Sequence, residues 1–341
     1  MGKRTLPLQA DTVILSDVRA LSNLLKRGDG RPGAVPCEHR PAKDGEIHEA
    51  LALILGAGGP PADAARVQDF IEFASHRAID LHDLWIARRG DRIAWAALPL
   101  ISPGKTVLIF APGSPPDADE AGPVLEALCQ LVRGRGVQLA QSLLDPADES
   151  GRALFARHGF GEMAELLYLH ALVRKPPPAP VLPAGYTWQT YSADSHAQFA
   201  QTILGSYEGS QDCPALNGLR EIEDIVAGHK ASGDFDPGFW YLLQESNVPR
   251  AVLLLCKVPR TEGVELVYLG ISPEARGRGL GDLLMRQALW AVREMNLSLL
   301  SLAVDAKNAP ALNLYYRHGL QRIGSKLAVM RDLRLADEAA R

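Results

Sequence analysis

The sequence lacks the features that mark a metal site, a disulfide framework or a membrane span. Its four cysteines, Cys37, Cys129, Cys213 and Cys256, lie far apart and form no CxxC pair, so they predict neither a zinc site nor disulfides. No apolar run approaches the roughly 20 residues that cross a bilayer. The first residues lack an apolar signal segment. We therefore expect a cytoplasmic protein with reduced thiols, no bound metal and no membrane partner.

An excess of charge of one sign is also missing. Lys and Arg number 36 against 40 Asp and Glu, so the overall balance favours neither a nucleic acid nor a membrane surface as partner. Residues 1–43 differ, with eight basic and four acidic residues. This basic extension is either a solvated terminus or an arm that touches phosphate or an acidic partner.

The proline-rich run KPPPAPVLPAG at 175–185 divides the chain near its middle. Its prolines exclude a helix interior and favour a semi-rigid extended linker. At 341 residues and 47% hydrophobic content, the chain is long enough for a separate core on each side.

The two sides of this linker show the same order of elements. After it, apolar spacing predicts a strand at 186–192, helices at 195–207 and 218–231, strands at 239–245, 249–258 and 263–272, a helix after residue 281, a strand at 297–305, a helix at 310–319 and a strand at 321–332. Before it, we expect helices at 46–55 and 63–78, strands at 84–91, 92–100 and 105–112, a helix at 119–136, a strand at 137–145, a helix at 149–159 and a strand at 161–173. LFARHGF at 154–160 also aligns with LYYRHGL at 314–320. The pattern indicates a duplicated α+β unit.

The loop RGRGLG at 276–281 lies between a predicted strand and a predicted helix. Its glycines allow the backbone to close around an anion, its two arginines add positive charge, and the following helix offers free N–H groups. A dinucleotide fingerprint would need glycine at Asp282, and the P-loop pattern is absent. Taken alone, the loop also fits a simple connecting turn.

The pattern R-x-x-G-x-G from Arg276 to Gly281 resembles the acyl-CoA pyrophosphate loop of the GCN5-related N-acetyltransferase (GNAT) superfamily. The pattern N-x-x-A-x-x-L-Y-x-x-x-G from Asn308 to Gly319 resembles the second signature of that superfamily, in the usual order. The resemblance covers residues 186–332 well and the first repeat weakly. The tandem is similar to two-domain acetyltransferases of the mycothiol-synthase type.

The resemblance implies an α+β fold of two tandem GNAT-like domains, each a mixed, mainly antiparallel sheet flanked by helices. We accordingly predict a basic extension (1–43), a degenerate GNAT-like domain (44–174), the linker (175–185), an active GNAT domain (186–335) and a tail (336–341).

Acetyl-CoA, or another acyl-CoA, is the co-substrate that the resemblance implies. Its pantetheine arm would pair with the strand at 263–272 where the strand at 297–305 splays away, with a bulge at Gly270 opening the gap. Asn308 would cap its helix or bind the CoA arm. The implied contact residues are Leu269, Gly270, Ile271, Arg276, Gly277, Arg278, Gly279, Leu280, Gly281 and Asn308.

Two side chains match catalytic positions of the family. Tyr315 corresponds to its tyrosine acid near the CoA sulfur; the alternative is a buried aromatic that anchors the helix. Glu265 is a lone acid in an apolar strand, where several members place a catalytic glutamate, and partial burial would raise its pKa toward neutrality. The alternative for Glu265 is a surface position, because many members use water or an already neutral amine.

The acceptor pocket of the family is formed by the first two helices and the loop between them, here 206–218. Glu208 and Asp212 would attract a cationic amine and Tyr207 would stack on it. An ordinary solvated loop is the alternative.

The first repeat departs from the family pattern. Its connection at 111–122 reads APGSPPDADEAG, whose prolines and acids would repel a pyrophosphate, and Phe155 stands at the tyrosine position. We expect this copy to buttress the active domain or shape the acceptor groove. His158 and His318 match across the repeats, which predicts a structural role for both.

The leading hypothesis is an N-acetyltransferase that moves an acetyl group from acyl-CoA to a primary amine, on a small molecule or a peptide, by direct transfer in a ternary complex. The alternative is a catalytically silent acyl-CoA sensor or partner-binding module. A nucleic-acid binder, the third possibility, would show steep salt dependence. Both a monomer and a homodimer remain open.

Overall fold

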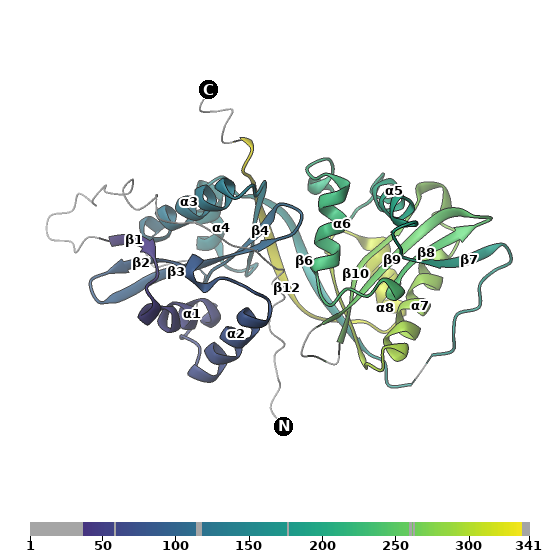
Figure 1. Cartoon of the computed structure of the whole chain (residues 1–341), viewed down its shortest axis with the longest axis horizontal. Coiled ribbons are helices and arrows are strands. Elements are labelled where there is room, and N and C mark those ends of the chain that lie inside the picture. The colour runs from purple at the N-terminus through teal and green to yellow at the C-terminus, as the bar shows by residue number, and fades with distance from the viewer. Residues whose placement is uncertain are drawn as a thin grey trace. The chain divides into compact units, whose positions relative to one another are not determined.

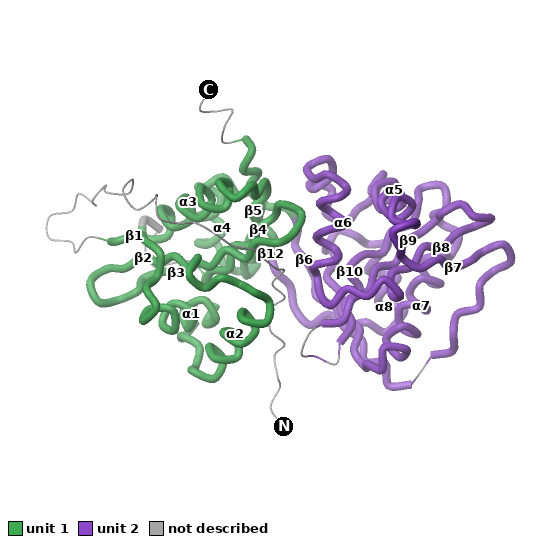
Figure 2. The backbone as a smooth tube through the Cα atoms, in the orientation of Figure 1, with its two compact units in different colours: residues 1–163, 327–341 green, residues 164–326 purple. Residues whose placement is uncertain are grey.

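The computed structural model describes residues 37–57, 59–113, 118–175, 177–258, 261 and 263–335. Most of the basic extension and the tail predicted at 336–341 therefore lie outside the described residues. The chain forms two compact units, residues 1–163 with 327–341 and residues 164–326 (Figure 2). In the described part, no helix has the length and apolar character of a membrane span.

The first unit is a mainly antiparallel sheet with helices on both faces (Figure 1). In sheet order its strands are β1 (Cys37–Pro41), β2 (Trp85–Arg89), β3 (Arg92–Ser102), β4 (Thr106–Phe110), β5 (Leu139–Leu144) and the part of β12 (Gln321–Asp332) from Leu327 onward. Its helices are α1 (Ile47–Gly56), α2 (Ala64–His76), α3 (Ala118–Gly134) and α4 (Glu149–Arg157). Of the neighbouring strands, β4 and β5 run parallel.

The second unit repeats this architecture. In sheet order its strands are the part of β6 (Gly161–Leu172) from Ala164 onward, β11 (Leu299–Asp305), β10 (Gly263–Ile271), β9 (Val248–Val258), β8 (Trp240–Glu245) and β7 (Tyr186–Thr190). Its helices are α5 (His196–Ser206), α6 (Ile222–Ala231), α7 (Leu280–Glu294) and α8 (Ala309–Arg317). β10 and β11 run parallel. The predicted fold class is confirmed, and of the described strands only β1, a short run without apolar alternation, was missed.

The last strand of each repeat pairs outside the domain that its place in the sequence suggests. β6 pairs with β11 in the second unit, and β12 from Leu327 onward pairs with β5 in the first. The compact units therefore differ from 44–174 and 186–335 at these two strands. Strand pairing is a non-local choice of backbone partners, which local patterns do not reveal.

The repeats share local detail as well as order. Asp148 caps α4 by accepting a hydrogen bond from the Gly151 N–H at 2.8 Å. Asn308 caps α8 in the same way, accepting from the Ala311 N–H at 3.3 Å. Side-chain caps of this kind satisfy N–H groups that have no partner inside the helix.

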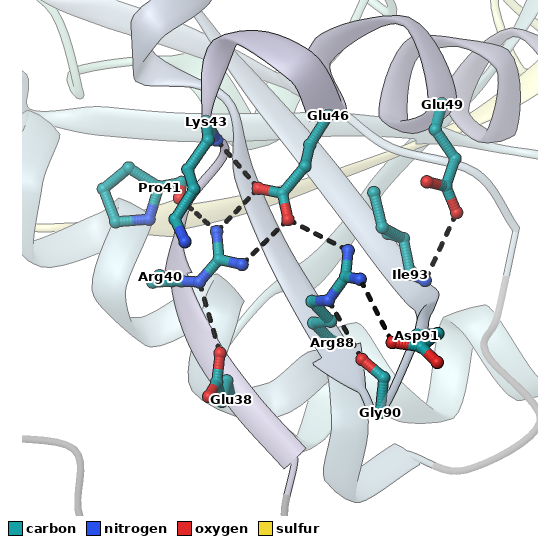
Figure 3. A network of polar contacts seen from close by, with 10 residues as sticks. All are labelled: Glu38, Arg40, Pro41, Lys43, Glu46, Glu49, Arg88, Gly90, Asp91 and Ile93. Atoms are coloured by element: carbon teal, nitrogen blue, oxygen red, sulfur yellow. Dashed lines mark hydrogen bonds and ion pairs between the residues drawn. The ribbon is translucent and has the colours of Figure 1, made fainter.

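A half-buried ion network fixes the start of the first unit (Figure 3). The Glu46 carboxylate accepts two hydrogen bonds from Arg40, at 2.7 and 2.8 Å, and one from Arg88 at 2.9 Å. It also accepts from the Lys43 backbone N–H at 2.9 Å. The Arg40 hydrogen bonds are the largest cause that lowers the pKa of Glu46 to about 2. The network ties β1 and β2 to the beginning of α1.

Candidate active site

β10 and β11 lie side by side at one end only. They pair in parallel from Gly263–Leu299 to Glu265–Ser301, and no further pair follows within these fully described strands. β10 stays paired with β9 to its end. The β11-facing backbone of residues 267–271 is therefore without a strand partner, and an extended chain can pair with such an edge.

The irregularity in β10 lies between Leu266 and Tyr268, where the register against β9 shifts. The bulge expected at Gly270 was wrong, because Gly270 pairs regularly with Val252. Glycine is needed there for another reason. A Cβ at Gly270 would collide with the Ser206 Oγ and lie 2.7 Å from Tyr268 Cε1. Gly270 thus allows the end of α5 to lie directly on β10.

The glycine loop begins α7 with two left-handed residues. Gly277 has φ 75° and Gly279, the N-cap of α7, has φ 78°, a region that side chains other than glycine disfavour. A Cβ at either position would meet no atom within 4 Å, so the space beside the loop is open. Leu280 and Leu284 bury the following helix against the sheet. The loop can therefore present the N-terminal N–H groups of α7 to an anion.

The two loop arginines are held differently. Arg276 donates to two backbone carbonyls, Ile271 at 3.2 Å and Ser206 at 2.9 Å. Arg278 instead forms an ion pair with Glu245 and donates to the Tyr186 hydroxyl at 2.7 Å. The charge of Arg278 is thus balanced by a carboxylate, whereas the hydrogen bonds of Arg276 go to neutral acceptors.

Tyr315 is buried on α8 with 6% of its surface exposed. It packs in the same cluster as Leu280 and Leu302. Burial, and secondarily the negative charge of Asp212, raise the pKa of its phenol, so the group keeps its proton at neutral pH. Among the described residues, no hydrogen-bond partner is found for its hydroxyl. A buried phenol of this kind is able to donate a proton or a hydrogen bond to a bound molecule.

Glu265 is half-buried at the last point where β10 and β11 pair. Its neighbours along the strand, Val264 and Leu266, belong to the core that contains α7. Because side chains alternate along a strand, Glu265 faces the opposite side of the sheet. Tyr268 reaches that same side although it is three residues away, since the bulge shifts the alternation and places it beside α5 and α6.

The 206–218 loop is tied to the end of β11. The Asp212 Oδ1 accepts from the Asp305 backbone N–H at 3.2 Å and from the Asn308 side chain at 3.4 Å. In return, Asp305 accepts from the Cys213 N–H at 3.2 Å. Burial is the main cause that raises the pKa of Asp212. The predicted acceptor residue Asp212 therefore lies beside the cap of α8.

The other two predicted acceptor residues, Tyr207 and Glu208, differ in their exposure to solvent. The Tyr207 ring lies edge-on to Tyr268 with centroids 5.6 Å apart, and burial raises its pKa to about 12. Glu208 is exposed. The structure thus brings Tyr207 and Asp212 together and leaves Glu208 toward solvent.

Sequence reasoning did not single out two polar neighbours of this cluster. The Tyr268 hydroxyl hydrogen-bonds to Ser206 Oγ at 2.8 Å, and its ring stacks on His229 at 5.4 Å. Burial lowers the pKa of His229 to about 3, so its ring is neutral. The spacing of Tyr268 from Glu265 predicts opposite faces, and only the bulge brings them to one face.

Comparison with known proteins agrees with this geometry. Residues 207–320 match the family model described as the acetyltransferase (GNAT) family. Residues 207–320 thus resemble a GNAT acetyltransferase domain. It is 29% identical over 257 residues to a mycothiol acetyltransferase of Rhodococcus erythropolis, covering 67% of this chain and 83% of that protein. It is 26% identical to the mycothiol acetyltransferase of Beutenbergia cavernae, covering 90% and 92%.

Solved structures support the tandem GNAT fold. A GCN5-related N-acetyltransferase from Sphaerobacter thermophilus superposes with a TM-score of 0.61 at 16% identity, over 87% of this chain and 96% of that one. A tandem GNAT protein from the clavulanic acid biosynthesis pathway gives 0.50 at 15% identity, over 87% and 98%. At these identities the likeness concerns the fold alone.

The first repeat differs from the second at the position that matches Tyr315. Phe155, at the position of Tyr315, is 1% exposed and packs edge-on against Phe160 at 5.1 Å. Residues 114–117 of the expected acidic connection lie outside the described part. Each repeat joins its matched histidine to the long helix of its own unit, as His158 to Glu126 at 3.1 Å and His318 to Asp282 at 2.8 Å. Both contacts fit a structural role.

Proposed function

We propose that the second unit transfers an acetyl group from acetyl-CoA to a primary amine directly, within a ternary complex. The amine nitrogen attacks the thioester carbonyl carbon, forming a C–N bond as the C–S bond breaks. Glu265 accepts the proton that the amine loses, and Tyr315 donates its proton to the departing thiolate. Exchange with solvent then restores both side chains.

Acetyl-CoA fits the features on the β10 side of this unit. The unpaired edge at Leu269, Gly270 and Ile271 suits the amide groups of the pantetheine arm, and Asn308 either serves as a helix cap alone or also contacts that arm. The open, left-handed turn at Gly277 and Gly279 suits the pyrophosphate. Backbone N–H groups supply the hydrogen bonds there without needing side chains.

Arg276 is the better candidate for the phosphate cation. Its guanidinium has further N–H groups beyond the two that bind carbonyl oxygens. Because those carbonyl groups are neutral, they do not balance the positive charge of Arg276. Arg278 would first have to release Glu245, although an exposed ion pair of this kind costs little to exchange.

The observation that carries the proposal is Tyr315, whose side chain is mostly buried, whose phenol is protonated and whose hydroxyl has no hydrogen-bond partner among the described residues. The sulfur of the leaving group would supply one. The bulged strand places Glu265 and Tyr268 on one face of the sheet, and Tyr207 and Asp212 supply aromatic and acidic groups for a cationic amine.

Steady-state kinetics test this assignment. We would measure release of the CoA thiol with a panel of primary amines, beginning with the acceptor of mycothiol acetyltransferases. Tyr315→Phe should lower kcat about a hundredfold, with the acetyl-CoA Kd unchanged. Tyr316→Phe is the matched control, because Tyr316 is adjacent and 46% exposed.

Two outcomes would contradict the proposal. Full activity of Tyr315→Phe would remove the acid role. Tight acetyl-CoA binding by the wild type without turnover of any amine would favour the sensor instead.

A further inference from the structure

β6 belongs to the first repeat by sequence but forms part of the sheet of the second unit. It pairs antiparallel with β11, with Tyr168 opposite Ala303 and His170 opposite Ser301. β11 in turn pairs with β10, with Ser301 beside Glu265. His170, Ser301 and Glu265 therefore form one row across three strands. Tyr168 is two residues from His170 on β6, so it lies on the same face as this row.

The buried core shows which face of the sheet Tyr168 occupies. On β6, Leu167 and Leu169 are buried in the cluster that contains α7, and on β11 Leu300 and Leu302 are buried there too. Strand alternation then directs Tyr168 to the opposite face, the one that Glu265 occupies. Ala303, which lies opposite Tyr168 in the register, is small and exposed.

The negative charge of Glu265 influences the pKa of Tyr168. Burial raises the pKa of its phenol to about 12, and the negative charge of Glu265 is the second cause. The phenol is therefore protonated at neutral pH and able to donate a hydrogen bond, which a carboxylate accepts.

The geometry points to Tyr168 as a positioning residue that orients the Glu265 carboxylate toward the incoming amine. This inference rests on the base role proposed above for Glu265. It also means that the degenerate repeat contributes a functional side chain to the active unit through its last strand.

A double-mutant cycle tests the inference. Tyr168→Phe keeps the ring and the strand and removes only the hydroxyl. In the wild-type background it should lower kcat/KM for the amine about tenfold, an effect of about 1.4 kcal/mol. In the Glu265→Gln background the same change should have less than about a twofold effect, because the group it orients is gone. The KM for acetyl-CoA should stay unchanged in both.

Tyr241→Phe is the matched control, since Tyr241 is buried on the other face of the same sheet. Equal losses in the two backgrounds, or no loss in the wild type, would overturn the role of Tyr168. A Glu265→Gln variant with full activity would instead refute the base assignment, so the two failures are distinguishable. Should Tyr168→Phe prove unstable, Ala303→Val provides a second variant that crowds the position directly opposite Tyr168 on β11. It should lower kcat/KM for the amine without changing the KM for acetyl-CoA, and unchanged activity would count against the inference.

Discussion

Asn308 donates a side-chain hydrogen bond to the Asp212 carboxylate across 3.4 Å, and this contact joins the 206–218 loop to the helix that carries Tyr315. The same carboxylate oxygen accepts from the Asp305 backbone. One side chain thus holds the end of β11, the cap of α8 and the 206–218 loop together. A contact of this kind couples the position of the loop to that of the proposed acid.

Removing the Asp212 carboxylate should therefore loosen the loop. We expect Asp212→Ala to lower the free energy of unfolding by about 1–3 kcal/mol, because two donors lose their acceptor. It should also lower kcat/KM for the amine while the acetyl-CoA Kd stays unchanged. Urea unfolding and steady-state kinetics measure both effects. Asp212→Asn retains an oxygen acceptor and should lose less stability, and the exposed Asp194→Ala should change neither quantity; equal behaviour of all three variants would disprove the coupling.

A negative side chain in the glycine loop should abolish acetyl-CoA binding. Gly279→Glu places a carboxylate where the pyrophosphate would lie and strains a residue at φ 78°. With ligand at about 100 times its Kd, the wild type should gain about 2.7 kcal/mol of stability, seen as a thermal shift, and the variant should gain none. Gly136→Glu controls for the backbone strain, since Gly136 has φ 84° and open space in the first unit. A retained shift in Gly279→Glu would rule out this loop as the anion site.

Contact between α5 and β10 should depend on the absence of a side chain at Gly270. We expect Gly270→Ala to destabilise the second unit by about 1–3 kcal/mol, because the new methyl group collides with Ser206. Ser206 cannot move freely, since its Oγ hydrogen-bonds to Ile203 and Tyr268. Combining Gly270→Ala with Ser206→Gly should recover part of the loss. Chemical denaturation measures these differences.

Gly205→Ala is the matched control for that series. A Cβ at Gly205 meets no atom within 4 Å and lies in a helix, where alanine is preferred by up to about 1 kcal/mol. The collision would be disproved if Gly270→Ala were as stable as Gly205→Ala.

Stability of the first unit should depend on pH through Glu46. Its pKa is lowered from 4.5 to about 2 in the folded state, so its contribution is fully present above the unfolded pKa and is lost as pH falls toward 2. Glu46→Gln should cost about 1–2 kcal/mol at pH 7, and the difference from wild type should shrink at pH 3. Urea unfolding at pH 7, 5 and 3 measures it. The exposed Asp69→Asn should show no such dependence, and a Glu46 effect that is constant with pH would contradict the linkage.

The sequence by itself determined the parts of this protein that depend on short-range physics. Apolar spacing defined the helices and strands, Asn308 and Asp148 capped their helices, and glycines at 277 and 279 marked the left-handed turn. Each of these follows from a few neighbouring residues, and so does the pattern from Asn308 to Gly319 that carries Tyr315. The duplicated order of elements was readable for the same reason.

Tertiary structure alone decided which strands are partners and which side chains face one another. The sheet of the second unit takes β6, which brings Tyr168 toward Glu265, and the bulge after Leu266 turns Tyr268 to that face. A one-residue irregularity reverses every later side chain, and pairing across more than 100 residues has no local signal. The hydrogen bonds of Asp212 to Asp305 and Asn308 belong to the same class, because they join loops that only the folded sheet brings together.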